Sequence, residues 1–242
     1  MKYAISIILS NPQIGENIGT AARSMLNFGL TDLRLVNPRD GWPNERAITL
    51  SSGALDVIEP KVFDTLAEAI SDLHFTFATT ARARDMVKPE FTPMSAAIEG
   101  KARIAQNQNI GIIFGAERSG LLNDEISQTQ AIISIPTNPD FSSLNLGQSV
   151  LLIAYEWMRV PAVEAATLDM GDSFPAVQND INNFITRLEN DLEERRFFRS
   201  EDLRATMRRN IQNIFTRADI SDQELRTLHG VLSALRGNKK AA

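Results

Sequence analysis

The sequence predicts an α/β protein with a mostly parallel sheet, followed by a small all-helical C-terminal extension. Short apolar runs alternate with helical stretches through residues 1–160, and only helical spacing of apolar residues follows later in the chain. A segment rich in Pro, Gly, Asp and Ser separates the two patterns. We therefore expect a domain at 1–160, a linker at 161–175 and a helical extension at 176–242.

Buried strands of a parallel sheet consist of short apolar runs that are bounded by turn residues. Such runs predict strands at Ala4–Leu9, Asp32–Val36, Phe75–Thr79, Ile110–Phe114 and Ile132–Ile135. Parallel neighbours need long crossover connections, which are usually helical. The spacing of apolar residues predicts these helices at Asn17–Asn27, Asp64–Leu73, Met94–Asn107 and Leu144–Arg159.

The C-terminal extension is expected to contain three helices. Ser221-Asp-Gln-Glu224 is a capping-box pattern, which predicts the start of the last helix. Residues 195–217 hold seven Arg against two acidic residues. This basic stretch indicates either a solvated helix face or a surface for RNA, because an acidic protein with one basic face is compatible with RNA binding.

Composition excludes several classes of protein. The hydrophobic content of 43% is ordinary, and no apolar run approaches the roughly 20 residues of a membrane span. The absence of Cys excludes disulfides, thiolate metal sites and a thiol nucleophile. His74 and His229 are too few and too separated to indicate a metal site. We expect a cytoplasmic protein with no membrane and no metal partner.

Three loop segments rich in Gly, Pro, Asn and Ser precede predicted helices. They are Asn11–Arg23, Phe114–Leu121 and Ile135–Asn145. Loops at the carboxyl ends of parallel strands meet at one edge of a sheet, so we expect the segments to form one ligand site. The chain has no Gly-x-Gly-x-x-Gly fingerprint after a strand and no Walker-type Gly-Lys-Ser/Thr. Dinucleotide and nucleoside triphosphate folds therefore lose support.

Each polar residue of these segments has two interpretations. Asn17 either caps its helix or contributes to the site. Arg23 is either a surface residue or a fork of donors for a phosphate or ribose. Glu117 is either solvated or orients a neighbouring group, and Gly115 permits a close approach by a ligand. Ser142 or Ser143 is a ready N-cap, although one cap does not explain the whole string of polar residues.

Together these motifs resemble the signature of the SPOUT superfamily, specifically its tRNA/rRNA 2′-O-ribose methyltransferase branch. The motifs are Asn-x-Gly-x-x-x-Arg at 17–23, Phe-Gly-x-Glu at 114–117 and Ser-Leu-Asn at 143–145. The resemblance covers essentially residues 3–159. The Arg-rich C-terminal helices look like the extension of one subgroup, the bacterial enzymes that methylate a ribose in the tRNA anticodon loop.

The resemblance implies an α/β trefoil knot and a homodimer whose active site uses both subunits. It implies methyl transfer from S-adenosylmethionine (SAM) to a ribose 2′-oxygen of tRNA, on a pyrimidine of the anticodon loop. The implied catalytic residues are Arg23, Asn17, Glu117, Ser143 and Asn145. The implied cofactor pocket comprises Thr79, Thr80, Ala81, Gly115, Ile135, Ser143, Leu144 and Asn145.

Contacts to RNA are expected from two groups of arginines. They are Arg82 and Arg84 near the cofactor pocket, and Arg195, Arg196 and Arg199 in the extension. A guanidinium stays charged near any working pH, so we expect Arg23 to stabilise the developing alkoxide and to align it. The alternatives are an rRNA 2′-O-methyltransferase, a non-catalytic RNA-binding homologue, and an unrelated α/β cofactor enzyme.

Overall fold

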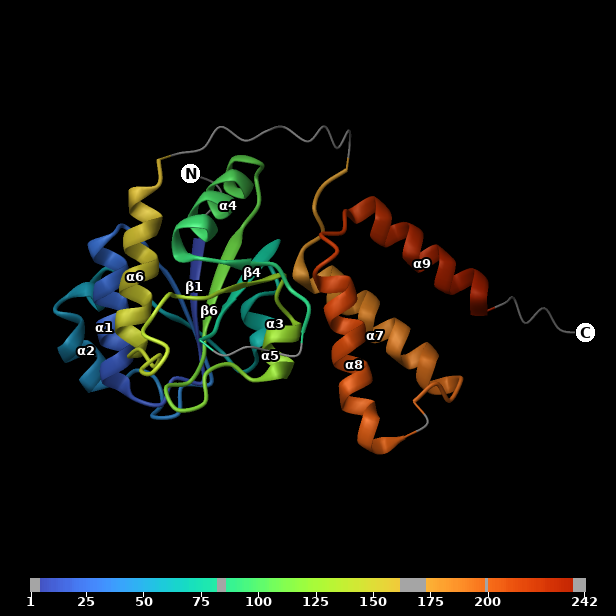
Figure 1. Ribbon diagram of the computed structural model, residues 1–242, viewed down its shortest axis with the longest axis horizontal. Coiled ribbons are helices and arrows are strands. Elements are labelled where there is room, and N and C mark those ends of the chain that lie inside the picture. Colours follow the sequence, from blue (N-terminus) through green and yellow to red (C-terminus); the bar gives the residue numbers. More distant parts are fainter. Residues whose placement is uncertain (1–4, 82–85, 162–172, 199, 237–242) are drawn as a thin grey trace, which may run out of the picture.

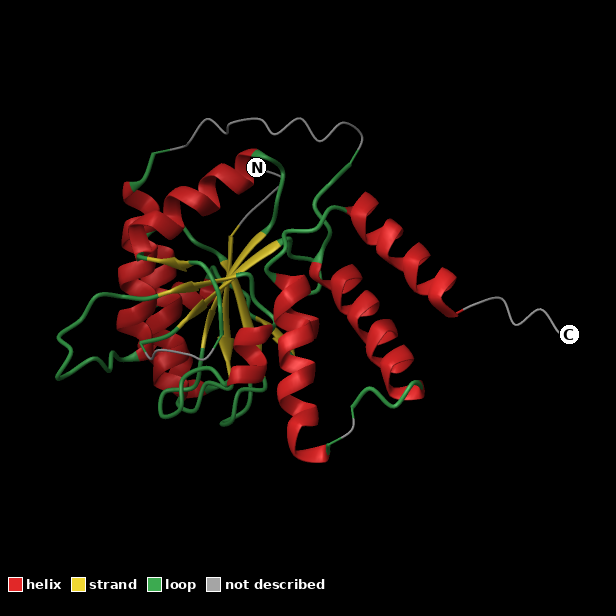
Figure 2. Cartoon of the chain, turned by 45° about the vertical axis from the view of Figure 1, so that its right-hand side comes forward, coloured by secondary structure: helices red, strands yellow, loops and turns green. Residues whose placement is uncertain are grey.

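The computed structural model describes residues 5–81, 86–161, 173–198 and 200–236 (Figure 1). A central sheet lies between two layers of helices, and three further helices pack on one side of this assembly (Figures 1 and 2). No helix in these ranges is long and apolar enough to cross a membrane.

The sheet is wholly parallel within the described residues, in the order β3-β2-β1-β6-β4-β7-β5. Its strands are β1 (Ile5–Ser10), β2 (Asp32–Val36), β3 (Lys61–Phe63), β4 (Phe75–Thr79), β5 (Glu90–Phe91), β6 (Ile110–Phe114) and β7 (Ala131–Ile133). The predicted bounds of β2, β4 and β6 are confirmed. The edge strands β3 and β5 were not predicted, because two or three partly exposed residues give no periodic signal.

The strand β7 ends at Ile133, two residues earlier than predicted. Pro136 follows closely and has no N–H for a ladder, so the chain leaves the sheet there. The predicted strand at Ala4–Leu9 is observed as β1, although Ala4 lies outside the described residues.

Helices cover both faces of the sheet. The first face carries α1 (Gly15–Asn27), α2 (Glu45–Ser51), α4 (Pro93–Ala105), α6 (Leu146–Arg159) and the short 3-10 helix η1 (Ala54–Asp56). The other face carries α3 (Leu66–Ala69) and α5 (Asn123–Ser127). The helix predicted at Asp64–Leu73 is much shorter, because a capping box at Thr65 and Glu68 starts it two residues late and the backbone leaves the helical conformation at Ile70, after Ala69. The first helix begins two residues before Asn17, and the fourth begins two residues after Leu144.

The C-terminal part of the described chain is helical, as expected. It consists of α7 (Gln178–Glu194), α8 (Glu201–Thr216) and α9 (Asp222–Arg236). These helices share a small apolar cluster of their own, which includes Phe184, Ile185 and Leu232. The capping box is confirmed, since the Ser221 N–H donates to Glu224 Oε2 (2.8 Å) and the Glu224 N–H donates to Ser221 Oγ (3.2 Å).

These helices dock on the sheet face that carries α3 and α5 (Figure 1). The backbone N–H of Gln178 donates to the carbonyl of Leu73 (2.9 Å). An ion pair joins Arg209 of α8 to Asp124 of α5 (3.5 Å). The extension therefore contacts the helix that directly follows the second loop segment of the candidate site.

A buried arginine joins strand β2 to the connection after α3. Arg34 of β2 is 5% exposed. Its guanidinium donates to Asp32 Oδ2 (3.0 Å), to Asp72 Oδ1 (2.5 Å) and to the carbonyl of Ala69 (2.7 Å). Burial raises the pKa of Asp32, but the hydrogen bond from Ser6 and the charge of Arg34 together hold it below its ordinary value.

Replacing Arg34 by Ala is expected to lower the free energy of unfolding at pH 7 by about 2 kcal/mol. The loss is below the range for a fully buried pair because the Asp72 side chain is 56% exposed. Urea unfolding measures it. The matched control is Arg46→Ala, whose ion pair with Glu16 is solvent-exposed and should contribute less than about 1 kcal/mol.

The same network predicts a pH dependence. The lowered pKa values of Asp32 and Asp72 stabilise the fold above their ordinary value of 3.8, and this stabilisation is lost as the pH falls through the lowered values. The difference between wild type and Arg34→Ala should therefore shrink below about pH 4. A difference independent of pH would contradict this assignment.

Candidate functional site

The carboxyl ends of the central parallel strands meet at one edge of the sheet. In the strand register Leu9 lies beside Phe114, Ala78 lies beside Ile113, and Thr79 lies beside Ile133. The chain therefore leaves β1, β6, β4 and β7 at nearly the same level. This register brings the three predicted loop segments together, as expected for the site of an open α/β sheet.

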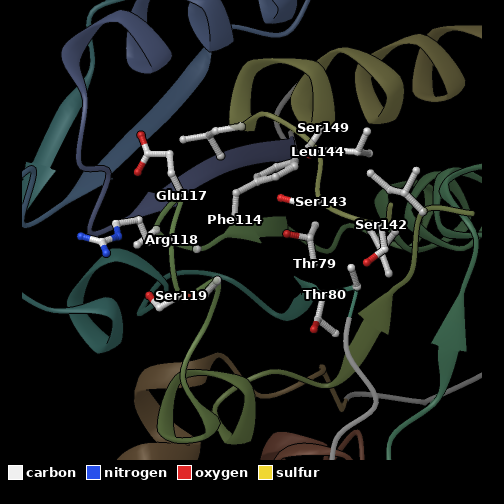
Figure 3. Close-up of a pocket in the computed structure, with 17 residues that line it drawn as sticks. Thr79, Thr80, Phe114, Glu117, Arg118, Ser119, Ser142, Ser143, Leu144 and Ser149 are labelled. Atoms are coloured by element: carbon white, nitrogen blue, oxygen red, sulfur yellow. Dashed lines mark hydrogen bonds between the residues drawn. The ribbon is translucent and has the colours of Figure 1, made fainter. Parts of the chain in front are cut away.

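A cavity of about 220 Å³ opens between the second and third of these loop segments and the end of β4 (Figure 3). Its walls come from the end of β4, from the loop after β6 and from the connection between β7 and α6. The lining residues are Thr79, Thr80, Ala81, Phe114, Gly115, Ala116, Glu117, Arg118, Ser119, Gly120, Ile133, Ile135, Ser142, Ser143, Leu144, Leu146 and Ser149. Apolar walls and hydroxyl groups alternate around it, a composition suited to a small ligand with both apolar and polar parts.

The structure places nearly all predicted cofactor residues around this cavity. They are Thr79, Thr80, Ala81, Gly115, Ile135, Ser143 and Leu144. The predicted Asn145 does not line the cavity and lies behind it as the N-cap of α6. Neither Ser142 nor Ser143 is the N-cap, so the interpretation of these serines as helix caps is wrong.

A chain of side-chain hydrogen bonds connects the three segments. The amide of Asn145 donates to Asn17 Oδ1 (2.8 Å), and the amide of Asn17 donates to Glu117 Oε1 (2.8 Å). The second carboxylate oxygen of Glu117 accepts from the backbone N–H of Gln13 (2.8 Å). Asn17 does not cap its helix, because α1 begins at Gly15 with Ile14 as N-cap. Its buried side chain is instead the middle member of this chain.

The same side chain of Asn145 starts helix α6. Its Oδ1 atom accepts from the backbone N–H groups of Gly147 (2.9 Å) and Gln148 (3.3 Å). This leaves only the amide nitrogen to face Asn17, which fixes the orientation of both amides. The hydrogen bonds therefore determine where α6 begins relative to α1.

The loop after β6 folds tightly on itself. A Cβ at Gly115 would lie 2.2 Å from Gly120 C and 2.2 Å from Leu121 N. The requirement for glycine there comes from the loop's own backbone, whereas the sequence suggested a close approach by a ligand. Gly120 has a positive φ of 66° and its N–H donates to the carbonyl of Ala116 (2.8 Å). Glu117 and Arg118 are thus presented by a rigid turn.

Arg23 lies apart from the cavity of its own chain. Its side chain is exposed, and it donates to the hydroxyl of Ser52 (2.9 Å) beyond the end of α2. Six positions separate it from Asn17, which is about 240° around a helix, so the two side chains point in different directions. The structure therefore joins Asn17, Glu117 and Asn145 in one network and places Arg23 outside it.

The predicted RNA-contacting arginines are only partly described. Arg82, Arg84 and Arg199 lie outside the described residues. The side chain of Arg195 donates to the carbonyl of Leu235 (2.9 Å), and Arg196 has a positive φ of 57°. Their role in RNA binding stays a prediction.

The basic stretch is partly compensated by acids from other helices. Arg204 pairs with Glu193 of α7 (3.2 Å), and Arg208 pairs with Glu189 of the same helix (3.4 Å). The positive charge of this stretch is therefore smaller than its sequence suggests, because acidic side chains of other helices lie beside it. Burial raises the pKa of Glu189, although the charge of Arg208 opposes this effect.

Several cavity residues were not among the individual site residues predicted from the sequence, although most of them lie in the predicted loop segments. They are Phe114, Ala116, Arg118, Ser119, Gly120, Ile133, Ser142, Leu146 and Ser149. They lie within or close to the second and third motif segments, so proximity along the chain was the available signal. Among the described residues, no group of three or more His, Asp or Glu side chains is arranged to hold a metal ion.

The fold and the cavity define an α/β protein whose ligand site lies at the carboxyl edge of a parallel sheet. The chain belongs to the SpoU rRNA Methylase family, whose model matches residues 4–155. It is 36% identical over 248 residues to the tRNA (cytidine/uridine-2′-O-)-methyltransferase TrmJ of Salmonella typhimurium strain LT2, covering 99% of each chain.

Solved structures agree with this assignment. The crystal structure of TrmJ from Z. mobilis ZM4 has a TM-score of 0.87 and 45% sequence identity, covering 96% of this chain and 99% of that chain. A methylase family protein from Neisseria gonorrhoeae has a TM-score of 0.68 and 27% identity, covering 77% of this chain and 94% of that chain.

Replacing Asn145 by Asp tests the hydrogen-bond chain. The carboxylate still accepts from the N–H groups of α6. It replaces the amide nitrogen that donates to Asn17 Oδ1 with an oxygen, so this hydrogen bond is lost and two oxygens repel each other. We expect the free energy of unfolding to fall by about 1–2 kcal/mol. Urea unfolding at pH 7 measures this loss.

The control is Asn44→Asp at the N-cap of α2. Its Oδ1 accepts from the N–H groups of Arg46 and Ala47, so aspartate should be neutral or slightly stabilising there. Equal effects of the two substitutions would show that the contact between Asn145 and Asn17 contributes nothing.

Proposed function

We propose that this protein is a SAM-dependent RNA 2′-O-ribose methyltransferase that acts on tRNA, on a pyrimidine ribose in the anticodon loop. The observation that carries the proposal is the cavity between the second and third motif segments, to which hydrogen bonds of Asn17 join the first segment, in a chain that resembles TrmJ along its whole length.

The apolar and polar side chains around the cavity suit the chemical groups of SAM. Phe114, Ile133 and Leu146 offer apolar surface for an adenine ring, and the hydroxyls of Ser142 and Ser143 offer partners for polar groups. The predicted pocket residues Thr79, Thr80, Ala81, Gly115, Ile135, Ser143 and Leu144 would hold the cofactor, with Asn145 shaping the pocket through α6. Bound SAM supplies an activated methyl group on its sulfonium, so no metal is required.

The residues of the hydrogen-bond chain have a positioning role in this proposal. Both carboxylate oxygens of Glu117 accept hydrogen bonds, so this side chain orients Asn17 and the loop around Gln13. Ser143 lines the cavity and would contact the cofactor or the ribose. Arg23 would stabilise the alkoxide that develops on the 2′-oxygen, because its charge persists at any working pH.

Arg23 lies apart from the cavity of its own chain, but in a homodimer it could reach the cavity of the second subunit. Helix α6 exposes the large apolar side chains Leu152, Tyr155 and Met158, and α2 exposes Ile48. Such a surface on neighbouring helices favours contact with a second copy. In this arrangement Arg23 of one subunit completes the cavity of the other subunit.

The remaining features of the proposal concern organisation. The catalytic domain would span 1–160 and contain a trefoil knot near its C-terminal end, followed by the linker 161–175. The extension 176–242 would bind RNA, build the dimer, or both, and its separate apolar cluster supports treating it as a unit. The proposed location is the cytoplasm, where tRNA is modified in bacteria.

An rRNA target is the second candidate, favoured by the description of the family model. The test is methyl transfer from labelled SAM to bulk tRNA and, separately, to rRNA, followed by nucleoside analysis. We expect a 2′-O-methylated pyrimidine nucleoside from tRNA. Label in rRNA alone would overturn the substrate, and absence of label together with absence of SAM binding would favour a non-catalytic RNA-binding homologue.

Replacing Arg23 by Ala is expected to abolish measurable turnover while leaving the Kd for SAM within a few fold. The matched variant is Glu117→Ala, which disrupts the cavity of its own subunit. Mixing the two inactive variants should restore about a quarter of wild-type activity, since half of the dimers are mixed and each has one intact site. Failure of mixing to restore activity, with subunit exchange verified, would place Arg23 in its own subunit's site.

A further inference from the structure

One charged side chain of the cavity has no partner among the described residues. Among the lining residues only Glu117 and Arg118 are ionisable. Both oxygens of Glu117 accept hydrogen bonds from Gln13 and Asn17. Arg118 is exposed, and its guanidinium makes no hydrogen bond or ion pair with the part of the chain that the structure describes.

Most described arginines of this protein bind a group of the same chain. Arg34 and Arg103 bind carboxylates, Arg187 binds a hydroxyl, and Arg195 binds a backbone carbonyl. The uncompensated charge of Arg118 therefore stands out at this edge of the sheet. In a protein with a net charge of −5, an unpaired cation at a cavity creates a local site for an anion.

The backbone that carries Arg118 is held on both sides. Ala116 and Gly120 are joined by the N–H to carbonyl hydrogen bond of the turn, and Gly115 packs directly against Gly120 and Leu121. The preceding residue, Glu117, is fixed by its two hydrogen bonds. An anion bound here would thus meet a preorganised donor, with little ordering of the loop required.

The position of Arg118 indicates which anion it meets. Figure 3 shows Glu117 and Arg118 at one end of the cavity and Ser142 at the other. Asn17 binds Glu117 at this end of the cavity, and we place the target ribose beside this hydrogen-bond chain. A 2′-hydroxyl in RNA always has a 3′-phosphodiester on the adjacent carbon, and a guanidinium matches two phosphate oxygens in a bidentate geometry.

We propose that Arg118 binds the phosphodiester next to the target ribose and so holds the 2′-oxygen against the methyl donor. This inference rests on the proposed function. It assigns Arg118 to the RNA substrate, whereas the carboxylate of the SAM methionyl group is the competing anion for the same cation.

The test compares full-length wild type, Arg118→Gln and Arg118→Lys with bulk tRNA and labelled SAM. Arg118→Gln should lower kcat/KM for tRNA by about 10- to 100-fold, the loss expected for a charge-assisted hydrogen-bonded pair. Arg118→Lys should recover part of this loss, because it keeps the charge without the fork. The Kd for SAM, measured without RNA, should stay within twofold.

Salt dependence provides a second readout that a structural role would not change. A lost phosphate contact should reduce the slope of log kcat/KM against log salt by about 0.7–0.9. The control is Lys61→Gln at the start of β3, an exposed cation that pairs with Asp32 (3.2 Å) away from the cavity and from the extension, which should leave activity and the salt slope within error of wild type.

The outcomes separate the competing explanations. An unchanged kcat/KM or salt slope in Arg118→Gln, with an active wild type, overturns the phosphate contact while the proposed function stands. A SAM Kd weakened as much as kcat/KM reassigns Arg118 to the cofactor carboxylate and also overturns the proposal. A wild type that methylates neither tRNA nor rRNA overturns the proposed function, and the assignment of Arg118 is lost with it.

Discussion

The hydrogen-bond chain from Asn145 through Asn17 to Glu117 is the interaction on which the candidate site depends. Each member comes from a different loop segment. The N–H of Gly147 fixes the orientation of the Asn145 amide, and the carboxylate of Glu117 fixes that of the Asn17 amide. Asn145 starts α6, Asn17 belongs to α1, and Glu117 holds the N–H of Gln13. A polar chain of this kind is stabilising only when every group is satisfied, so it determines a single arrangement of the loops.

Close packing of the backbone makes this arrangement possible. A Cβ at Gly19 would lie 2.2 Å from the carbonyl oxygen of Ala47, and a Cβ at Gly147 would lie 2.4 Å from the hydroxyl of Thr20. Helix α1 therefore approaches α2 and α6 as closely as glycine allows. The small residues place the polar side chains within hydrogen-bonding distance, so packing and site geometry are consequences of the same choice of residues.

The electrostatics of this protein cannot be read from the number of charges in a stretch of sequence, because the fold brings other charges close to them. The basic stretch around α8 has acidic partners on α7 and α5, including Glu189, Glu193 and Asp124. Nothing in the sequence distinguishes Arg118 from other arginines, yet it lines the cavity with no partner in the described part of the chain. An electrostatic site depends on which charges lie within a few ångströms, and residues far apart in sequence supply most of those neighbours.

The sequence by itself determined the parallel α/β class, three strands to the residue, the helical C-terminal part and the segments that line the cavity, because periodicity and motif residues are local properties. Only the tertiary structure decided that Asn17 belongs to a hydrogen-bond chain, that Asn145 caps α6, and that Arg23 lies outside its own cavity. The hydrogen-bond chain joins residues 100 positions apart, whose geometry the strand register sets, and the place of Arg23 depends on its contact with Ser52 across the α1–α2 packing.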